Sequence, residues 1–383
     1  MTRSARRAGA RVRDVRRRSR CALPACGLLA VLAAPAAAVP AVGRPAPSAR
    51  LPADDATAAV DRVVHDDRIR ESSGLAASPL HPGVLWTFND GGDPDLFAVG
   101  RDGTTTATVG VGKAGKENWE AVACVRGPRD TPMIAIGDVG DNDGSRASVD
   151  IVLVAEPRSL RDTSVLPDLV LRLRYPDGAS DAETLLADPR TNRLYLVTKD
   201  GTGVVHAVPE SAWPGTSGTV PDPSQGADAG APPVRTGELE RVAEVDLPMA
   251  TDGTVLPDGR VVLRSKTDLV VLPAIETWTR GSVVRPLGTA GIPEQEQGES
   301  LTLSGSDLLV GSEGKEQPIL RVGLPAGTDP VQDPGTGNTG RKPESSRWGD
   351  VATWGLGCAF LAGGLGVGFL RRRRSGSARA GRS

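Results

Sequence analysis

The sequence predicts an all-β protein, a β-propeller of five four-stranded blades, followed by one C-terminal transmembrane helix. Short apolar runs separated by turn residues roughly every 8–12 positions indicate strands rather than helices. A unit of similar pattern recurs along residues 73–313, with a period typical of propeller blades at about 45–50 residues. An uncharged stretch of twenty residues, 351–370, precedes four arginines.

Each repeat begins with a small or acidic residue and a few apolar ones, then a turn and a stronger strand that ends in polar residues. The five copies begin at Ser73, Glu120, Glu183, Asp252 and Glu299, with spacings of 47, 63, 69 and 47 residues. A tract rich in Pro, Gly and Ala, residues 214–237, lengthens the third interval and is expected to be a surface loop. Six blades are the alternative if the two long intervals hide a degenerate blade. A two-sheet β-sandwich would explain the strands but not the repeated opening.

The propeller domain is expected over residues 59–325. The last repeat retains only the apolar run 319–322 after its second strand, so it is short of one strand. The run 60–65, ahead of the first repeat, can complete that blade and remove its open sheet edge.

The N-terminus has the three parts of a secretory signal peptide, assigned to residues 1–41. Nine arginines precede residue 21, an apolar stretch covers 22–34, and small residues follow at Ala36, Ala38 and Ala41. An uncleaved anchor is the alternative, but the apolar stretch is short for a membrane span. Residues 42–58 form a flexible lead-in rich in Pro and Ala.

The C-terminus predicts a stalk, a membrane span and a basic tail. Residues 326–347 carry Gly, Pro, Thr and Ser and form the stalk. Residues 348–370 form the transmembrane helix, with Trp348 and Trp354 at the outer interface, and residues 371–383 carry six arginines that mark the cytoplasmic side. A buried core helix is the competing interpretation. The expected localisation is the cell membrane, single-pass, with the head extracytoplasmic.

Charge and cysteine content narrow the classes of function. Between residues 21 and 347 the chain has 30 basic and 45 acidic residues, a net charge of −15, which argues against a nucleic-acid partner. The excess of acidic residues either keeps an exported domain soluble or binds cations. Cys124 is the only cysteine of the head, so no disulfide forms within it. No GxSxG, P-loop or zinc-binding pattern is present.

The leading acids of the repeats are the first candidate site. The first strand of a propeller blade lines the central channel, so Glu120, Glu183, Asp252 and Glu299 are expected near one axis, with Ser73 in the fifth place. Clustered carboxylates need a cation, protons or hydrogen-bond donors. Calcium is a candidate cofactor because it accepts many oxygen ligands. In the alternative, each acid binds neighbouring backbone and fixes the blades.

Two polar loops follow second strands and would open on the same rim. One contains Asn89 and Asp90. The other contains Asp138, Asp141 and Asn142 among glycines, with Arg146 close behind. A metal or substrate loop and a tight turn are both consistent with this composition. The metal hypothesis takes Glu120, Asp138 and Asp141 as ligands.

Several of these segments resemble a family of secreted bacterial β-propeller proteins. The family patterns are W-x-x-N-D-x-G, D-W-E-x-[IL]-A and G-D-[IV]-G-D-N, and the similar segments here are 86–92, 118–123 and 137–142, followed by Glu156-Pro157. Asn118 stands where the family has Asp. The resemblance covers residues 70–200 well, and it implies a propeller fold without a settled activity.

Three functions follow from these observations. The first is a membrane-anchored module that binds an extracellular ligand or protein on its acidic rim or channel. The second is a calcium-dependent hydrolase with an acidic central channel. The third is a structural protein of the cell envelope.

Overall fold

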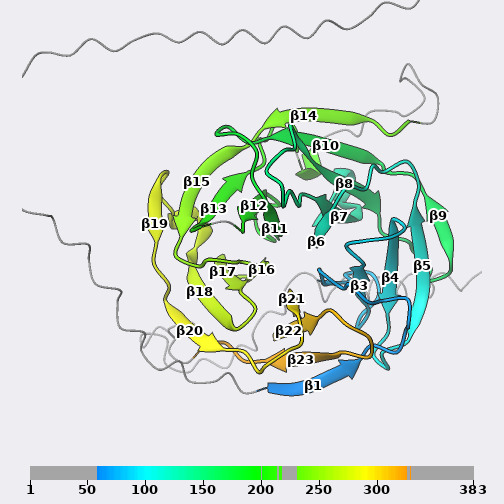
Figure 1. The fold of residues 1–383 in the computed structure, drawn as a ribbon. Helices are drawn as coiled ribbons and strands as arrows, with labels where there is room; N and C mark the ends of the chain where they lie inside the picture. The colour runs from blue at the N-terminus through cyan, green and yellow to red at the C-terminus, as the bar shows by residue number, and fades with distance from the viewer. Residues whose placement is uncertain (1–57, 200, 214, 218–230, 326–327, 329–383) are drawn as a thin grey trace, which may run out of the picture. The chain divides into compact units, whose positions relative to one another are not determined.

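A computed structural model describes residues 58–199, 201–213, 215–217, 231–325 and 328 of the chain. Their strands form five separate sheets placed around a central channel (Figure 1), which confirms the five-bladed propeller. Within the described residues the remaining regular elements are 3₁₀ turns, among them η1 (Pro128–Asp130), η2 (Gly215–Ser217) and η4 (Ile275–Thr277).

The first two blades follow the chain in order. Blade 1 comprises β2 (Ala76–Ala77), β3 (Leu85–Phe88), β4 (Asp95–Val99) and β5 (Thr105–Val111). Blade 2 comprises β6 (Trp119–Arg126), β7 (Pro132–Asp138), β8 (Val149–Ala155) and β10 (Leu169–Arg174). In both blades all neighbouring strands are antiparallel.

The other three blades repeat the plan. Blade 3 comprises β11 (Ala182–Ala187), β12 (Leu194–Thr198), β13 (Gly203–Ala207) and β15 (Glu240–Val245). Blade 4 comprises β16 (Asp252–Val255), β17 (Arg260–Arg264), β18 (Asp268–Ala274) and β20 (Gly288–Gly291). Blade 5 comprises β21 (Gly298–Ser304), β22 (Asp307–Ser312), β23 (Pro318–Val322) and β1 (Ala58–Val63).

The N-terminal strand closes the ring. Strand β1 pairs antiparallel with β23, so that Val60 lies opposite Leu320, and the predicted completion of the last blade is confirmed. The chain therefore joins its first and last described strands in one sheet, in which β1 covers the edge of β23 and becomes the outermost strand itself.

Three short strands extend blades 1, 2 and 3 outward, and two of them, β9 and β14, lie in the two long intervals of the repeat. Strand β9 (Thr163–Val165) pairs parallel with β5, β14 (Val234–Glu238) with β10, and β19 (Ser282–Val284) with β15. The two long intervals of the sequence thus contain added outer strands, and a hidden sixth blade is not supported. Strand β14 begins inside the tract 214–237, so the loop prediction is wrong for residues 234–237.

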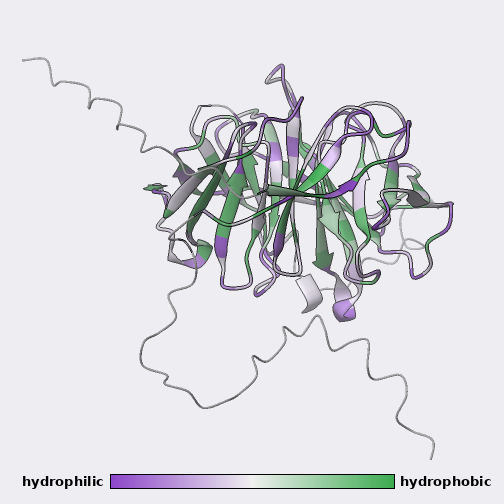
Figure 2. Cartoon of the chain, turned by 90° about the horizontal axis from the view of Figure 1, so that it is seen from below, coloured by the Kyte–Doolittle hydropathy of each residue, from purple (hydrophilic) through white to green (hydrophobic). Residues whose placement is uncertain are grey.

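The core lies between successive blades rather than in one central mass. Trp86 and Phe88 of blade 1 pack with Ile134 and Val152 of blade 2, and similar apolar clusters join each later pair of blades. Figure 2 shows hydrophobic residues gathered along the strands and hydrophilic ones in many of the connecting loops. Successive side chains of a strand point to opposite faces, and strands such as β3, β7 and β12 are buried at nearly every position, so both faces of a blade take part in the packing.

The predicted targeting segments lie almost entirely outside the described residues. These are the signal peptide (1–41), the lead-in (42–58), the stalk (326–347), the transmembrane helix (348–370) and the basic tail (371–383). Across the described ranges, no helix has the length and apolar character that crossing a membrane requires.

Candidate functional site

The five innermost strands form a closed ring around the channel. Each contacts two others, in the order β2, β6, β11, β16, β21 and back to β2. Equivalent strands of a propeller run the same way along its axis. The residues that open these strands therefore lie at one end of the channel, as the repeat predicted.

Three of the leading acids occupy β-bulges. Glu120, Glu183 and Glu299 are each the second residue of their inner strand, and in each case the pairing with the next strand skips that residue. A bulge leaves its residue out of the ladder and turns the side chain away from the usual alternation. The same irregularity in three blades gives three glutamates a common local geometry at one end of the channel.

The carboxylates at this end influence one another in a closed sequence, and we call the five of them the acidic ring. The charges of Glu183 and Asp90 raise the pKa of Glu120, and the charge of Glu299 raises the pKa of Glu183. The charges of Glu299 and Asp90 raise the pKa of Glu313, which completes the sequence. Four of the five blade positions contribute, since Glu299 and Glu313 both belong to blade 5 or its flanking turn. Like charges this close disfavour the ionised form.

Burial and repulsion raise the pKa of several ring members. Burial, reinforced by Glu183, raises the pKa of Glu120 to about 9. Burial also raises the pKa of Glu183 to about 7, despite a hydrogen bond from Lys199 that lowers it. The pKa of Glu313 is raised to about 7 by burial and then by Glu299. At neutral pH the ring therefore carries protons that ordinary carboxylates would have lost.

Glu183 is only half satisfied. Its Oε1 forms an ion pair with Lys199 Nζ, while its buried Oε2 has no hydrogen-bond partner among the described residues. The whole residue is 7% exposed. A buried carboxylate oxygen without a donor is costly, and such atoms are uncommon in folded proteins.

Two ammonium groups partly neutralise the ring. Burial is the largest single influence and lowers the pKa of Lys199, but the hydrogen bond to Glu183 and the charges of Glu183, Asp181 and Glu120 together outweigh it, so the net shift is upward. Lys266 Nζ lies 3.3 Å from Glu299 Oε1 across blades 4 and 5, with its side chain half exposed. Lys116, whose charge acts on Asp90, is a third cation, and three cations against five carboxylates leave an excess of acidic groups at this end of the channel.

A third lysine ties the first polar loop to blade 2. Lys116 Nζ donates to the carbonyl oxygens of Asn89, at 2.7 Å, and Gly91, at 2.8 Å, and lies 4.9 Å from the centre of the Trp119 ring. Burial lowers the pKa of Lys116, and Asp90 opposes that shift. Burial and the neighbouring Glu71 carboxyl raise the pKa of Asp90.

Asn89 has a structural role in the same loop. Its Oδ1 accepts the backbone N–H groups of Arg70 and Glu71, and its Nδ2 donates to the carbonyl of Arg68. All of its hydrogen-bonding atoms are thereby engaged in holding the segment that leads into blade 1. Of the predicted pair, Asp90 is a member of the acidic ring, whereas the side-chain oxygen and nitrogen of Asn89 are both used within the loop.

Asp252 departs from the other leading acids. It has no bulge, lies opposite Arg264 in the β16–β17 ladder, and is 1% exposed. Its Oδ1 accepts the N–H of Gly253 at 2.8 Å, and its Oδ2 accepts the N–H of Leu301 at 2.6 Å. Burial raises its pKa well above the usual range. For Asp252 the structure therefore supports the alternative in which the acid fixes neighbouring blades.

The second polar loop is a network of internal hydrogen bonds. Asp138 accepts the N–H groups of Glu117 and Asn118 and the Nη1 of Arg146, at 3.0 Å. Asp141 accepts the N–H groups of Ser145 and Arg146. The turn interpretation accounts for these contacts, and Asn142 is exposed beside them.

The metal hypothesis gains no support from this geometry. Both carboxylates of the loop are occupied by N–H donors. In the part of the chain that the structure describes, no three His, Cys, Asp or Glu side chains are grouped so that they could hold a metal ion. Glu120, Asp138 and Asp141 are therefore not brought together as ligands, because Glu120 turns to the acidic ring while the two aspartates bind their own loop.

Comparison with known proteins adds only distant likenesses of fold. No family model matches the chain, and no curated protein matches it. Among solved structures, a gluconolactonase from Xanthomonas campestris is 16% identical over 72% of this chain and 98% of its own, with a TM-score of 0.36. A glucose dehydrogenase is 11% identical over 70% of this chain and 99% of its own, with a TM-score of 0.40.

Proposed function

We propose that this protein is a membrane-anchored, extracytoplasmic propeller that binds an organic cation, an ammonium or guanidinium group, in the acidic ring. The signal peptide and the arginine-flanked apolar segment of the sequence support the export and the anchoring. The observation that carries the binding role is the unpartnered Glu183 Oε2 inside an excess of carboxylates.

The charge imbalance of the ring favours a cationic ligand. Glu120, Glu183 and Glu313 keep raised pKa values in the presence of the neighbouring lysines. A bound cation would relieve this repulsion and allow the carboxylates to ionise, so binding and deprotonation support each other. The rigid inner strands hold the acids in place before a ligand arrives, which limits the entropy lost on binding.

The spacing of the acids favours a ligand with several N–H donors. The ring members come from different strands around the channel, and their oxygens are not gathered around one point. A diamine or guanidinium can donate to carboxylates on different strands, whereas a bare ion needs oxygens at about 2.3–2.6 Å on several sides. The free Glu183 Oε2 is the natural acceptor for one such donor.

A binding titration tests this function. The full-length protein is titrated with putrescine, arginine methyl ester or calcium chloride at constant ionic strength, and binding is followed by calorimetry. We expect saturable binding of the organic cations, weakened about tenfold or more in Glu183→Gln, as for loss of a charge-assisted hydrogen bond.

The matched control is Glu210→Gln, which removes an exposed glutamate after β13. It should bind like the native protein. Equal binding by all three proteins, or binding of calcium alone, would overturn the proposal.

Protease treatment of intact cells tests the anchoring separately. The propeller should be digested from outside while the C-terminal tail stays protected. Protection of the propeller would contradict the proposed orientation without bearing on cation binding.

A further inference from the structure

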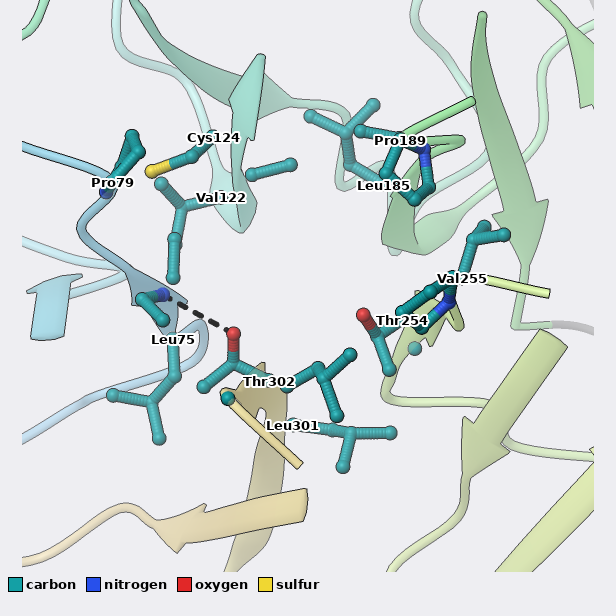
Figure 3. A pocket seen from close by; sticks show the side chains of 18 residues that line it. Leu75, Pro79, Val122, Cys124, Leu185, Pro189, Thr254, Val255, Leu301 and Thr302 are labelled. Carbon is teal, nitrogen blue, oxygen red and sulfur yellow. Dashed lines mark hydrogen bonds between the residues drawn. The ribbon is translucent and has the colours of Figure 1, made fainter. Parts of the chain in front are cut away.

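The opposite end of the channel holds a cavity of different character, which we call the apolar cavity. It measures about 300 Å³ and is lined by residues of all five inner strands and of the turns that follow them. Figure 3 shows Leu75, Val122, Leu185 and Leu301 arranged around it. None of the lining residues carries a charge.

The apolar cavity follows from the same repeat that builds the acidic ring. In every blade, the residue two positions after the leading residue lines it. These residues are Leu75, Val122, Leu185, Thr254 and Leu301. Two residues advance a strand by about 7 Å, so the channel changes from acidic to apolar within a short distance.

The cavity is rigid and reachable. Its walls are the five innermost strands, each paired with the second strand of its blade and in contact with the innermost strands of the two neighbouring blades. Its rim includes Pro79, Pro189 and Pro257, of which Pro257 is exposed and the others are partly exposed. Proline limits the freedom of the rim. A ligand therefore meets a preformed pocket, and little ordering entropy is lost on binding.

One hydroxyl group offers a hydrogen bond at one side of the apolar cavity. The Thr254 hydroxyl points toward it (Figure 3) and makes no hydrogen bond within the described ranges. The Thr302 hydroxyl is engaged, since it accepts the N–H of Ala77 at 3.2 Å. A ligand with one hydrogen-bonding group can use the free hydroxyl while the rest of its surface meets apolar side chains.

We infer that the apolar cavity is a second binding site, for a small uncharged and largely apolar molecule that bears one hydrogen-bonding group. Its volume equals the share of roughly ten water molecules in the liquid, at about 30 Å³ each. Water in such a space finds few polar partners, so an apolar molecule that displaces it gains the hydrophobic free energy of burial. This inference is independent of cation binding in the acidic ring.

Ligand-observed NMR on the full-length protein tests the site, with indole and naphthalene as probes. Both should bind saturably. Thr254→Val removes the hydroxyl at similar size, so it should weaken indole about three- to tenfold and leave naphthalene unchanged, as for loss of one neutral hydrogen bond. Thermal melting confirms that each variant is folded.

Filling variants give the complementary test. Ala187→Leu and Ala77→Leu place a larger side chain in the lining from two different blades, and each should abolish saturable binding of both probes. Ala59→Leu makes the same change on the exposed outer strand β1 and should bind like the native protein. Equal binding by native and filled proteins, or no saturable binding by the native protein, would overturn the inference.

Alkylation of Cys124 gives a second readout. This thiol lines the cavity, and burial raises its pKa well above the usual range. Indole should slow its reaction with iodoacetamide in a saturable way, as followed by mass spectrometry of the peptide. A rate that does not depend on indole would contradict occupancy of the cavity.

Discussion

Asp252 Oδ2 accepts the backbone N–H of Leu301 at 2.6 Å, and this hydrogen bond joins the inner strands of blades 4 and 5. Arg264, which is fully buried, reinforces the same junction through the carbonyls of Ser300 and Gly311, at 2.9 and 3.0 Å. One leading acid of the repeat, Asp252, thus joins two neighbouring blades, while the other three, Glu120, Glu183 and Glu299, belong to the acidic ring.

The role of Asp252 predicts a loss of stability on its removal. Asp252→Ala leaves the buried N–H groups of Leu301 and Gly253 without their acceptor and opens a gap beside Arg264, and should lower the free energy of unfolding by about 3 kcal/mol or more. Asp252→Asn keeps an acceptor and should cost less. Urea denaturation measures both.

Glu299→Ala provides the control for this experiment, since Glu299 occupies the same repeat position but its carboxylate pairs, among the described residues, only with the half-exposed Lys266. Its effect should stay below about 1 kcal/mol. A larger loss for Glu299→Ala than for Asp252→Ala would contradict the division of roles.

Replacing Glu120 by glutamine should stabilise the protein in a way that depends on pH. Its pKa is raised from 4.5 to about 9 in the folded protein, so the folded state binds the extra proton between these values and stability falls as pH rises through them. Glu120→Gln should remove this loss. We expect a Tm that is higher by several degrees at pH 8, where the two pKa values allow a gain in the free energy of unfolding of at most about 5 kcal/mol, and no gain near pH 4.

Thermal melting of the two proteins from pH 4 to pH 9 measures the difference. A gain that is the same at every pH would show that the effect comes from packing rather than from titration of the carboxyl group.

Cation binding should strengthen as pH rises. The pKa values of about 7 for Glu183 and Glu313 and about 9 for Glu120 mean that a cation must displace protons at neutral pH. The affinity for putrescine should therefore rise between pH 6 and pH 9, by at most about tenfold per pH unit for each proton released.

Calorimetry in buffers of different ionisation enthalpy counts the protons directly. We expect release at pH 7 and less of it in Glu120→Gln. Proton uptake, or an affinity that does not change with pH, would contradict a cation bound by the acidic ring.

Closure of the propeller predicts a specific requirement for glycine at position 103. Gly103 has φ of +79°, and a Cβ atom there would lie 1.7 Å from the Val63 carbonyl oxygen at the end of β1. Its own carbonyl accepts the His65 N–H at 2.8 Å. Gly103→Ala should cost about 2 kcal/mol or more and reduce the hydrogen-exchange protection of the His65 amide.

Gly281→Ala is the matched control, because Gly281 has φ of +74° with nothing within 4 Å of an added Cβ. It carries the backbone cost alone, about 1 kcal/mol, and should leave His65 protected. Equal effects of the two substitutions would remove the argument for a close approach at the closure.

The fold was predictable because its information is local and repeated. Short apolar runs separated by turn residues mark the inner two strands of every blade. The last repeat lacks one strand, which predicted the pairing of β1 with β23. The outer strands β9, β14 and β19 were not predicted, since they are short and pair with the preceding blade rather than with a sequence neighbour.

The site was predictable only in part, because it depends on register. The repeat located Glu120, Glu183 and Glu299, but a one-residue bulge decides that these side chains leave the ladder while Asp252 stays in it opposite Arg264. Lys199 and Glu313 follow the second strands of their blades, and the polar endings of those strands were the available indication. No feature of the sequence around Lys116 indicated its role, because its hydrogen bonds are made with a loop of the previous blade.

The most direct measurement is a crystal structure of the protein with putrescine. The account predicts an ammonium group at hydrogen-bond distance, about 3 Å, from Glu183 Oε2, with a second donor near Glu120 or Glu313. Putrescine bound elsewhere, or an acidic ring that stays without it while the ligand is saturating, would contradict the account.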